Sequence, residues 1–186
     1  VKDNVLSKEK TDMALYLIEL TPATASKDEA TALIETVSNS LSEGAELIET
    51  QVSADHKLIF AIIESENTAF APALTAAIGE RASVVGPDEV RLVGAELDDI
   101  KKLKKDADYL VEWDIPAEIT MEQYLTRKKA NAPKYAEVPE VSFLRTYVRE
   151  DTAKCLCFYD APDEEAVVRA RKAVSTPIDR LFKLHA

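Results

Sequence analysis

The segment from Val141 to Glu165 reads VSFLRTYVREDTAKCLCFYDAPDEE. Two runs rich in aromatic and β-branched residues flank the charged segment Arg149 to Thr152, a pattern typical of a β-hairpin. The second run ends at Ala161-Pro162-Asp163-Glu164-Glu165, where a proline and acidic residues indicate the start of a helix. The segment therefore predicts two antiparallel strands followed directly by a helix.

The residues on both sides of this hairpin extend it to a six-element pattern. A strand is expected over 109–113, and Thr120 with Gln123 predicts a capped helix that Pro133 ends or kinks. A helix over 163–174 and a short strand near Arg180 follow the hairpin. The order is strand, helix, strand, strand, helix, strand.

The first half of the chain shows the same order. Ser26 and Glu29 have the spacing of a capping box, and Gly44 is a typical helix stop. Gly86-Pro87 predicts a turn before the last strand. The expected elements are a strand over 13–20, a helix over 27–42, strands over 45–52 and 57–64, a helix over 67–79 and a strand over 89–93.

Short matches relate the two halves at a spacing of about ninety residues. Tyr16-Leu17-Ile18-Glu19 resembles Tyr109-Leu110-Val111-Glu112, and Thr176-Pro177 corresponds to Gly86-Pro87. We therefore expect an α+β fold of two tandem ferredoxin-like units, with their sheets facing each other about a pseudo-twofold axis, as in a dimeric α/β barrel. The expected domains are 13–96 and 109–186, with the charged segment 97–108 as the linker.

Composition limits the classes of function. The chain has 186 residues, 46% of them hydrophobic, and a formal net charge of -11. An acidic surface repels phosphate backbones, so nucleic acid is not an expected partner. Apolar runs such as 58–63 are too short to cross a membrane. The chain begins at Val1 without a Met, and its polar first dozen residues are typical of a disordered leading segment or of a processed terminus. A cytoplasmic protein is expected, or an exported one if Val1 is a processed terminus.

The second half also resembles a bacterial family of unknown function. The residues that carry this resemblance are Tyr109 to Glu112, Thr146-Tyr147-Val148 with Glu150-Asp151, Cys157, the run Ala161 to Ala166, Pro177 and Arg180. The best-characterised members are small nickel-binding, ferredoxin-like proteins that pair as dimers. The resemblance implies that fold, an intrachain pairing of the two units, and nickel as the candidate metal. It also implies a ligand position one turn into the last helix, where the family often has His and this chain has Ala170.

Two cysteines are candidate metal ligands. Strand alternation places Cys155, Cys157 and Tyr159 on one face, with Leu156 and Phe158 on the other. Two thiolates on one face can bind a soft transition metal. The alternative is that both are small buried hydrophobic side chains, because free cysteine usually behaves that way.

Polar residues within apolar strands are the candidate ligand-binding residues. Glu19 and Glu112 occupy equivalent positions in the two halves, and carboxylates in the space between the sheets would have raised pKa values. The alternative is that they pair with Arg145 or Arg91. Arg145 and Tyr147 are expected to share a strand face with Phe143, where an aromatic pair beside a guanidinium can clamp an anionic or planar ligand. The alternative is that the aromatic rings belong to the core and that Arg145 extends its charged end to water.

Three functions are compatible with these features. The first is a binding protein for a metal ion or small molecule near the interface of the two repeats, acting as a monomer or homodimer. The second is a cofactor-free isomerase or oxygenase that acts on a small organic molecule between the sheets. The third is a structural module. We favour the first, so catalysis is not the leading expectation.

Overall fold

Eight antiparallel strands form one sheet in the computed structural model, which describes residues 12–103 and 105–185. The strand order is β2-β3-β1-β4-β6-β7-β5-β8. The strands are β1 (Ala14–Pro22), β2 (Ala45–Val52), β3 (Ile59–Ser65), β4 (Ala82–Val93), β5 (Tyr109–Asp114), β6 (Ser142–Arg149), β7 (Lys154–Asp160) and β8 (Arg180–Lys183).

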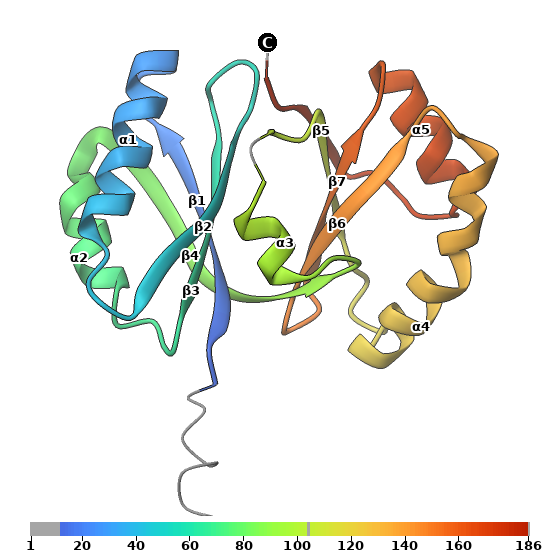
Figure 1. The fold of residues 1–186 in the computed structure, drawn as a ribbon, viewed down its shortest axis with the longest axis horizontal. Helices are drawn as coiled ribbons and strands as arrows, with labels where there is room; N and C mark the ends of the chain where they lie inside the picture. The colour runs from blue at the N-terminus through green and yellow to red at the C-terminus, as the bar shows by residue number, and fades with distance from the viewer. Residues whose placement is uncertain (1–11, 104, 186) are drawn as a thin grey trace, which may run out of the picture.

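Helices cover the outer faces of this sheet. The helical segments are α1 (Lys27–Ser40), α2 (Ala71–Ile78), the 3-10 turn η2 (Gly79–Arg81), α3 (Leu97–Lys101), α4 (Met121–Asn131), the 3-10 segment η3 (Ala132–Glu137) and α5 (Glu164–Ala173). In Figure 1, α1 and α2 flank one side of the molecule, α4 and α5 flank the other, and the strands lie between them. The first half (β1 to β4) and the second half (β5 to β8) therefore turn their strands toward each other.

The two halves have equivalent strand orders. The first half is arranged β2-β3-β1-β4 and the second β6-β7-β5-β8, the order of a βαββαβ ferredoxin-like unit. Antiparallel pairing of β4 with β6 joins the halves into one continuous sheet rather than two separate ones. On the opposite side, the backbone N–H of Ala54 donates to the carbonyl of Lys183 at 2.7 Å. The expected α+β, antiparallel fold is confirmed, whereas the domain boundaries at 97–108 stay a prediction.

Buried side chains form three apolar clusters. One lies between α1, α2 and the first half of the sheet, and a second between α4, α5 and the second half. The third lies between the two halves and includes Leu17 and Phe60 from the first and Leu110, Leu156 and Phe158 from the second. Because strand side chains alternate, β7 points Leu156 and Phe158 into this central cluster and its cysteines toward the helices.

Gly86-Pro87 does not form the predicted turn. Both residues lie inside β4, where the register with β1 shifts between Leu17 and Glu19. Gly86 has φ +100°, and a Cβ there would meet the carbonyl oxygen of Leu17. The pair forms a bulge, and only glycine combines this backbone conformation with this close approach.

The ends of the helices agree with most of the sequence signals. Thr120 and Gln123 form a complete capping box, and α4 gives way to a 3-10 segment just before Pro133. The side chain of Ser26 accepts from the N–H of Glu29, but the Glu29 carboxylate bonds Arg81 instead of returning to the cap. The predicted capping box of α1 is therefore only half present.

The segment between the halves packs against the body of the protein. It contains α3, and its residues Ile100 and Ala107 are buried. In the part of the chain that the structure describes, no helix is long and apolar enough to cross a membrane. The predictions for the first dozen residues fall, except for Asp12, outside the described residues.

Candidate ligand-binding site

The predicted site residues lie on opposite faces of the sheet. Glu19, Glu112, Arg145 and Tyr147 lie on the face between the two halves, where their ionic and hydrogen-bond partners come from both halves. Cys155 and Cys157 belong to the cluster that faces α4 and α5. The six residues therefore do not form one site.

Lys154 brings the two predicted carboxylates together. Its Nζ lies 2.8 Å from an oxygen of Glu19 and 3.4 Å from an oxygen of Glu112. Arg180 bonds both Glu112 and Asp114. Burial raises the pKa of Glu19, and the hydrogen bond and charge of Lys154 oppose this effect only in part. The alternative partners named from the sequence are wrong, because Arg145 bonds Glu49 and Arg91 bonds Glu150.

Arg145 and Tyr147 share one partner. The guanidinium of Arg145 donates to both oxygens of Glu49, at 2.9 and 2.5 Å, and the hydroxyl of Tyr147 donates to the same carboxylate. Burial raises the pKa of Tyr147, and the charge of Glu49 adds to that effect. The position an anionic ligand would take at Arg145 is thus held by Glu49, and ligand binding by these residues stays a prediction.

Phe143 does not share a face with Arg145 and Tyr147. The pairing of β6 with β7 shifts between Phe143 and Arg145, which is a β-bulge. The extra residue turns Phe143 to the helix side, where its ring stacks on Tyr135 at a centroid distance of 5.4 Å. The prediction that Phe143 lies beside Arg145 as part of an aromatic clamp is therefore wrong.

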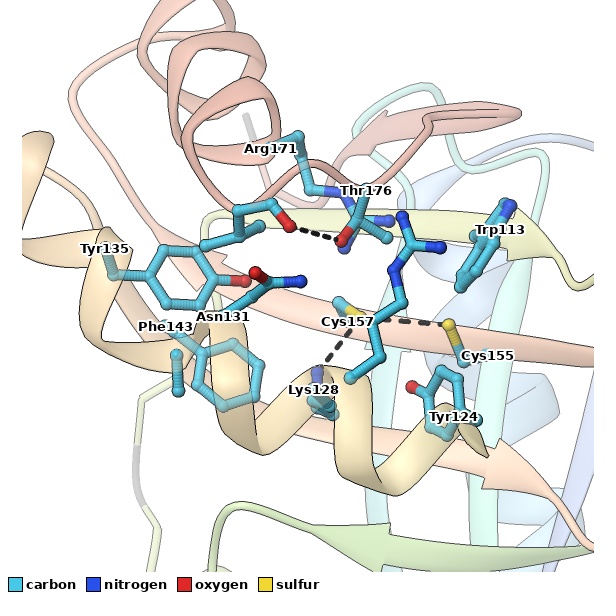
Figure 2. A pocket seen from close by; sticks show the side chains of 13 residues that line it. Trp113, Tyr124, Lys128, Asn131, Tyr135, Phe143, Cys155, Cys157, Arg171 and Thr176 are labelled. Carbon is cyan, nitrogen blue, oxygen red and sulfur yellow. Dashed lines mark hydrogen bonds between the residues drawn. The ribbon is translucent and has the colours of Figure 1, made fainter. Parts of the chain in front are cut away.

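A small pocket lies beneath α4, η3 and α5 in the second half. We call it the thiol pocket. Its volume is about 40 Å³, and its lining residues are Trp113, Tyr124, Arg127, Lys128, Asn131, Ala132, Tyr135, Phe143, Cys155, Cys157, Arg171, Val174 and Thr176. Figure 2 shows the two thiols on the strand floor, with Lys128 and Arg171 reaching toward them from the helices. None of these lining residues is acidic.

The two thiols have different environments. Their sulfurs lie 4.0 Å apart, and each side chain belongs to a residue that is 1% exposed. The hydroxyl of Thr146 donates to Sγ of Cys157 at 3.1 Å, and Nζ of Lys128 lies 4.0 Å from the same sulfur. The hydrogen bond from Cys155 and the charges of Lys128 and Arg171 hold the pKa of Cys157 well below its usual range, against the effect of burial.

Arg171 is a buried cation that bonds no carboxylate among the residues that the structure describes. It is 2% exposed and lies on the inner face of α5 beside Val167 and Ala170. Its terminal nitrogens donate to the hydroxyl of Tyr159 at 3.1 Å and to the carbonyl of Pro177 at 2.6 Å, whereas its Nε has no partner. Burial alone would lower the pKa of Arg171, but the nearby Cys157 and Tyr159 raise it. The hydroxyl of Tyr124, also buried in the pocket, makes no hydrogen bond of normal geometry.

Two further cations line the same pocket. The guanidinium of Arg127 lies 5.5 Å from the centroid of the Trp113 ring, and the ammonium of Lys128 lies 4.5 Å from that of Phe143. Neither contact supplies a negative charge. Sequence reasoning missed these cations. The available signal was Arg171 itself, which falls four residues after Val167 on an otherwise apolar helix face.

A nickel site does not fit the residues present. In residues 12–103 and 105–185 there is no group of three or more His, Cys, Asp or Glu that could hold a metal ion. The position implied as a His ligand is Ala170, which is fully buried. A divalent ion beside the thiols would also meet the positive charges of Lys128 and Arg171, so the pocket does not suit nickel.

Residues 109–184 match the family described as nickel responsive protein SCO4226-like. The second half of this chain is a SCO4226-like domain. The crystal structure of SCO4226 from Streptomyces coelicolor A3(2) is similar to 42% of this chain over 95% of its own length, at 18% identity and a TM-score of 0.37. No curated protein matches the chain.

Two solved structures are similar to nearly the whole chain. A protein assigned as chlorite dismutase TA0507 covers 93% of this chain and 95% of its own, at 15% identity and a TM-score of 0.55. A protein assigned as a monooxygenase from Fusobacterium nucleatum covers 93% of this chain and 91% of its own, at 12% identity and a TM-score of 0.53. At these identities the likeness shows the shared α+β fold alone.

Proposed function

We propose that this protein is a binding protein for a small organic carboxylate, held in the thiol pocket beneath α4 and α5. The observation that carries the proposal is Arg171, a buried guanidinium with no carboxylate partner and a free Nε–H. An unpaired buried charge is costly, and nature normally offsets it with an opposite charge and hydrogen bonds. A bound anion would supply both.

The donors around Arg171 favour an occupant that accepts hydrogen bonds. The Nε of arginine can only donate, and the hydroxyl of Tyr124 is a second buried group that makes no hydrogen bond of normal geometry. Arg127 and Lys128 add positive charge, and no Asp or Glu side chain lines the pocket of a chain whose net charge is -11. A carboxylate matches the planar donor geometry of a guanidinium.

The walls limit the size of this ligand. A volume of about 40 Å³ accepts a carboxylate group and a short chain, but no large ring system. The rings of Trp113, Tyr124, Tyr135 and Phe143 suit an apolar tail. The proposal keeps the binding function expected from the sequence and moves the site from the space between the halves to the helix side of the second half.

Calorimetric titration with acetate, propionate and butyrate tests this function, with the matching amides as neutral controls. The carboxylates should bind and the amides should not. In the proposed complex the ammonium of Lys128 donates to the bound carboxylate, and a hydrogen bond to a charged group contributes about 1.5–3 kcal/mol. Lys128→Met should therefore weaken binding by roughly 10- to 100-fold. Lys172→Met removes an exposed positive charge from the same helix as Arg171 and should leave binding unchanged.

Two outcomes would contradict the proposal. One is equal affinity for the carboxylates and their amides, because charge would then play no part. The other is an equal loss of affinity in Lys128→Met and Lys172→Met, which would indicate attraction by the overall charge of the protein instead of a built site.

A further inference from the structure

The two cysteines of the thiol pocket form a second feature that the carboxylate does not use. They are free, both lie on the helix-facing side of β7, and their sulfurs are 4.0 Å apart. Residues two apart on a strand are poorly placed for a disulfide. Both side chains nevertheless line the same pocket, and Figure 2 shows them side by side on the strand.

We infer that Cys155 and Cys157 bind one Cu(I) ion between their sulfurs. A metal–sulfur bond measures about 2.3 Å, so one ion bridges sulfurs up to about 4.6 Å apart in a linear pair. The observed 4.0 Å separation lies within that reach and corresponds to a bent sulfur–metal–sulfur arrangement. Thiolates are soft ligands, and soft ligands select Cu(I) over the harder ions.

The absence of further ligands favours this ion over zinc and nickel. Structural zinc takes four protein ligands. The part of the chain that the structure describes offers no third His, Cys, Asp or Glu to the two thiols. A two-coordinate site is therefore the only kind that the described residues can complete, and Cu(I) is the ion that two thiolates satisfy.

The charges of the pocket support the same ion. Two thiolates and one Cu(I) carry a net charge of minus one, whereas the same ligands with a divalent ion are neutral. Lys128, with its Nζ 4.0 Å from Cys157, and the buried Arg171 offset an anionic complex. The hydroxyl of Thr146 donates to the sulfur of Cys157 and holds it in place.

Binding exchanges protons for the metal. Each thiol that is protonated in the free protein releases its proton when its sulfur binds Cu(I), and no electron is transferred. This inference goes beyond the proposed function, because it concerns the cysteines and a metal ion instead of the cations and a carboxylate. The two can fail separately, since serine at the cysteines leaves Arg171, Lys128 and Tyr124 unchanged.

Anaerobic titration with Cu(I), against a chromogenic Cu(I) chelator, tests the inference on the full chain. One equivalent should bind, and Cys155→Ser or Cys157→Ser should each abolish competition with the chelator. Lys128→Met should weaken binding by about tenfold, as outer-shell changes do. Lys172→Met should have no effect, and neither Ni(II) nor Zn(II) should displace the copper.

A second measurement covers the case in which a serine variant fails to fold. In the unaltered protein, bound Cu(I) should protect both cysteines from alkylation during partial unfolding, as read by mass spectrometry. Tighter binding of Ni(II) or Zn(II), full copper binding by a folded serine variant, or cysteines that alkylate equally with and without copper would each overturn the inference. Carboxylate titrations on the metal-free serine variants would then still report on the proposed function alone.

Discussion

Cys155 and Cys157 differ in acidity although they lie two residues apart on β7. The pKa of Cys155 is raised by its hydrogen bond to Cys157 and by burial, whereas that of Cys157 is lowered by the same hydrogen bond and by Lys128 and Arg171. Deprotonation is therefore favoured at Cys157 over Cys155.

Titration of the thiolate ultraviolet absorbance tests this distribution of charge. The unaltered protein should show one thiolate at neutral pH, and Cys157→Ser should show none. Lys128→Met should raise the pKa of Cys157, because it removes a nearby positive charge. Two thiols that both titrate in the ordinary range would contradict the assignment.

Glu19 gives a pH dependence with a defined sign. Burial raises its pKa above the ordinary value of 4.5, so the folded state favours the protonated carboxyl. The stability that this group contributes is fully present below the unfolded pKa and is lost as the pH rises through the folded pKa. We expect Glu19→Gln to gain unfolding free energy relative to the unaltered protein between pH 4 and neutral pH.

Denaturant unfolding at several pH values measures this difference. Asp151→Asn is a useful control of opposite sign, because its hydrogen bonds from Arg149 lower the pKa of Asp151. A Glu19→Gln difference that is constant with pH, or that falls as the pH rises, would be inconsistent with a raised pKa.

The sequence predicted on which face of a strand a residue lies better than it predicted the hydrogen-bond and ionic partners of that residue. Alternation correctly separated the cysteines from Leu156 and Phe158, because a strand has a period of two. It could not show that Lys154 bridges Glu19 and Glu112, since that contact joins strands from both halves through a long flexible side chain. Arg171 was missed because a single charge on a helix face does not reveal what it faces.

At the scale of elements, regular strands were predictable and bulges were not. The hairpin of β6 and β7 has the expected turn and two alternating runs. A bulge adds one residue opposite a particular partner strand, so it depends on pairing that a single strand does not encode. The bulges at Phe143 and at Gly86 account for the two clearest errors of the sequence prediction.

Substitution of Gly86 tests the role of the bulge in β4. Both Gly86 and Gly79 have positive φ, but only at Gly86 would a Cβ meet backbone atoms. Gly79→Ala should cost about 1 kcal/mol of unfolding free energy, the usual effect of positive φ. Gly86→Ala should cost more, roughly 2–4 kcal/mol, because backbone must also move. Equal losses in denaturant unfolding would contradict this account of the bulge.

At the scale of the whole molecule, the central cluster ties the two halves together. Phe158 is 1% exposed and packs there with Leu17 and Phe60 from the other half. Phe158→Ala should cost about 3–5 kcal/mol, whereas the exposed Val168→Ala should change stability by less than about 0.5 kcal/mol. The tandem plan was visible in the sequence, but the packing between the halves depends on tertiary contacts.

Unfolding of Phe158→Ala should also remain a single transition. The chain has one tryptophan, Trp113, in the second half, so its fluorescence reports on that half and circular dichroism on both. The two signals should coincide, because the halves share a core. Separate transitions of the two signals, in this variant or in the unaltered protein, would show that the halves unfold independently.

The Nε–H of Arg171 offers the most direct test of the central claim, that a buried unpaired cation marks an anion-binding pocket. Its proton and nitrogen resonances can be followed by NMR during titration with propionate, with propionamide as the control. We predict that both resonances change in a saturable way with propionate and not with propionamide. The change should occur over the same range of propionate concentration as the binding measured by calorimetry. A resonance that does not move at saturating propionate, or that moves equally with propionamide, would contradict the proposed carboxylate site.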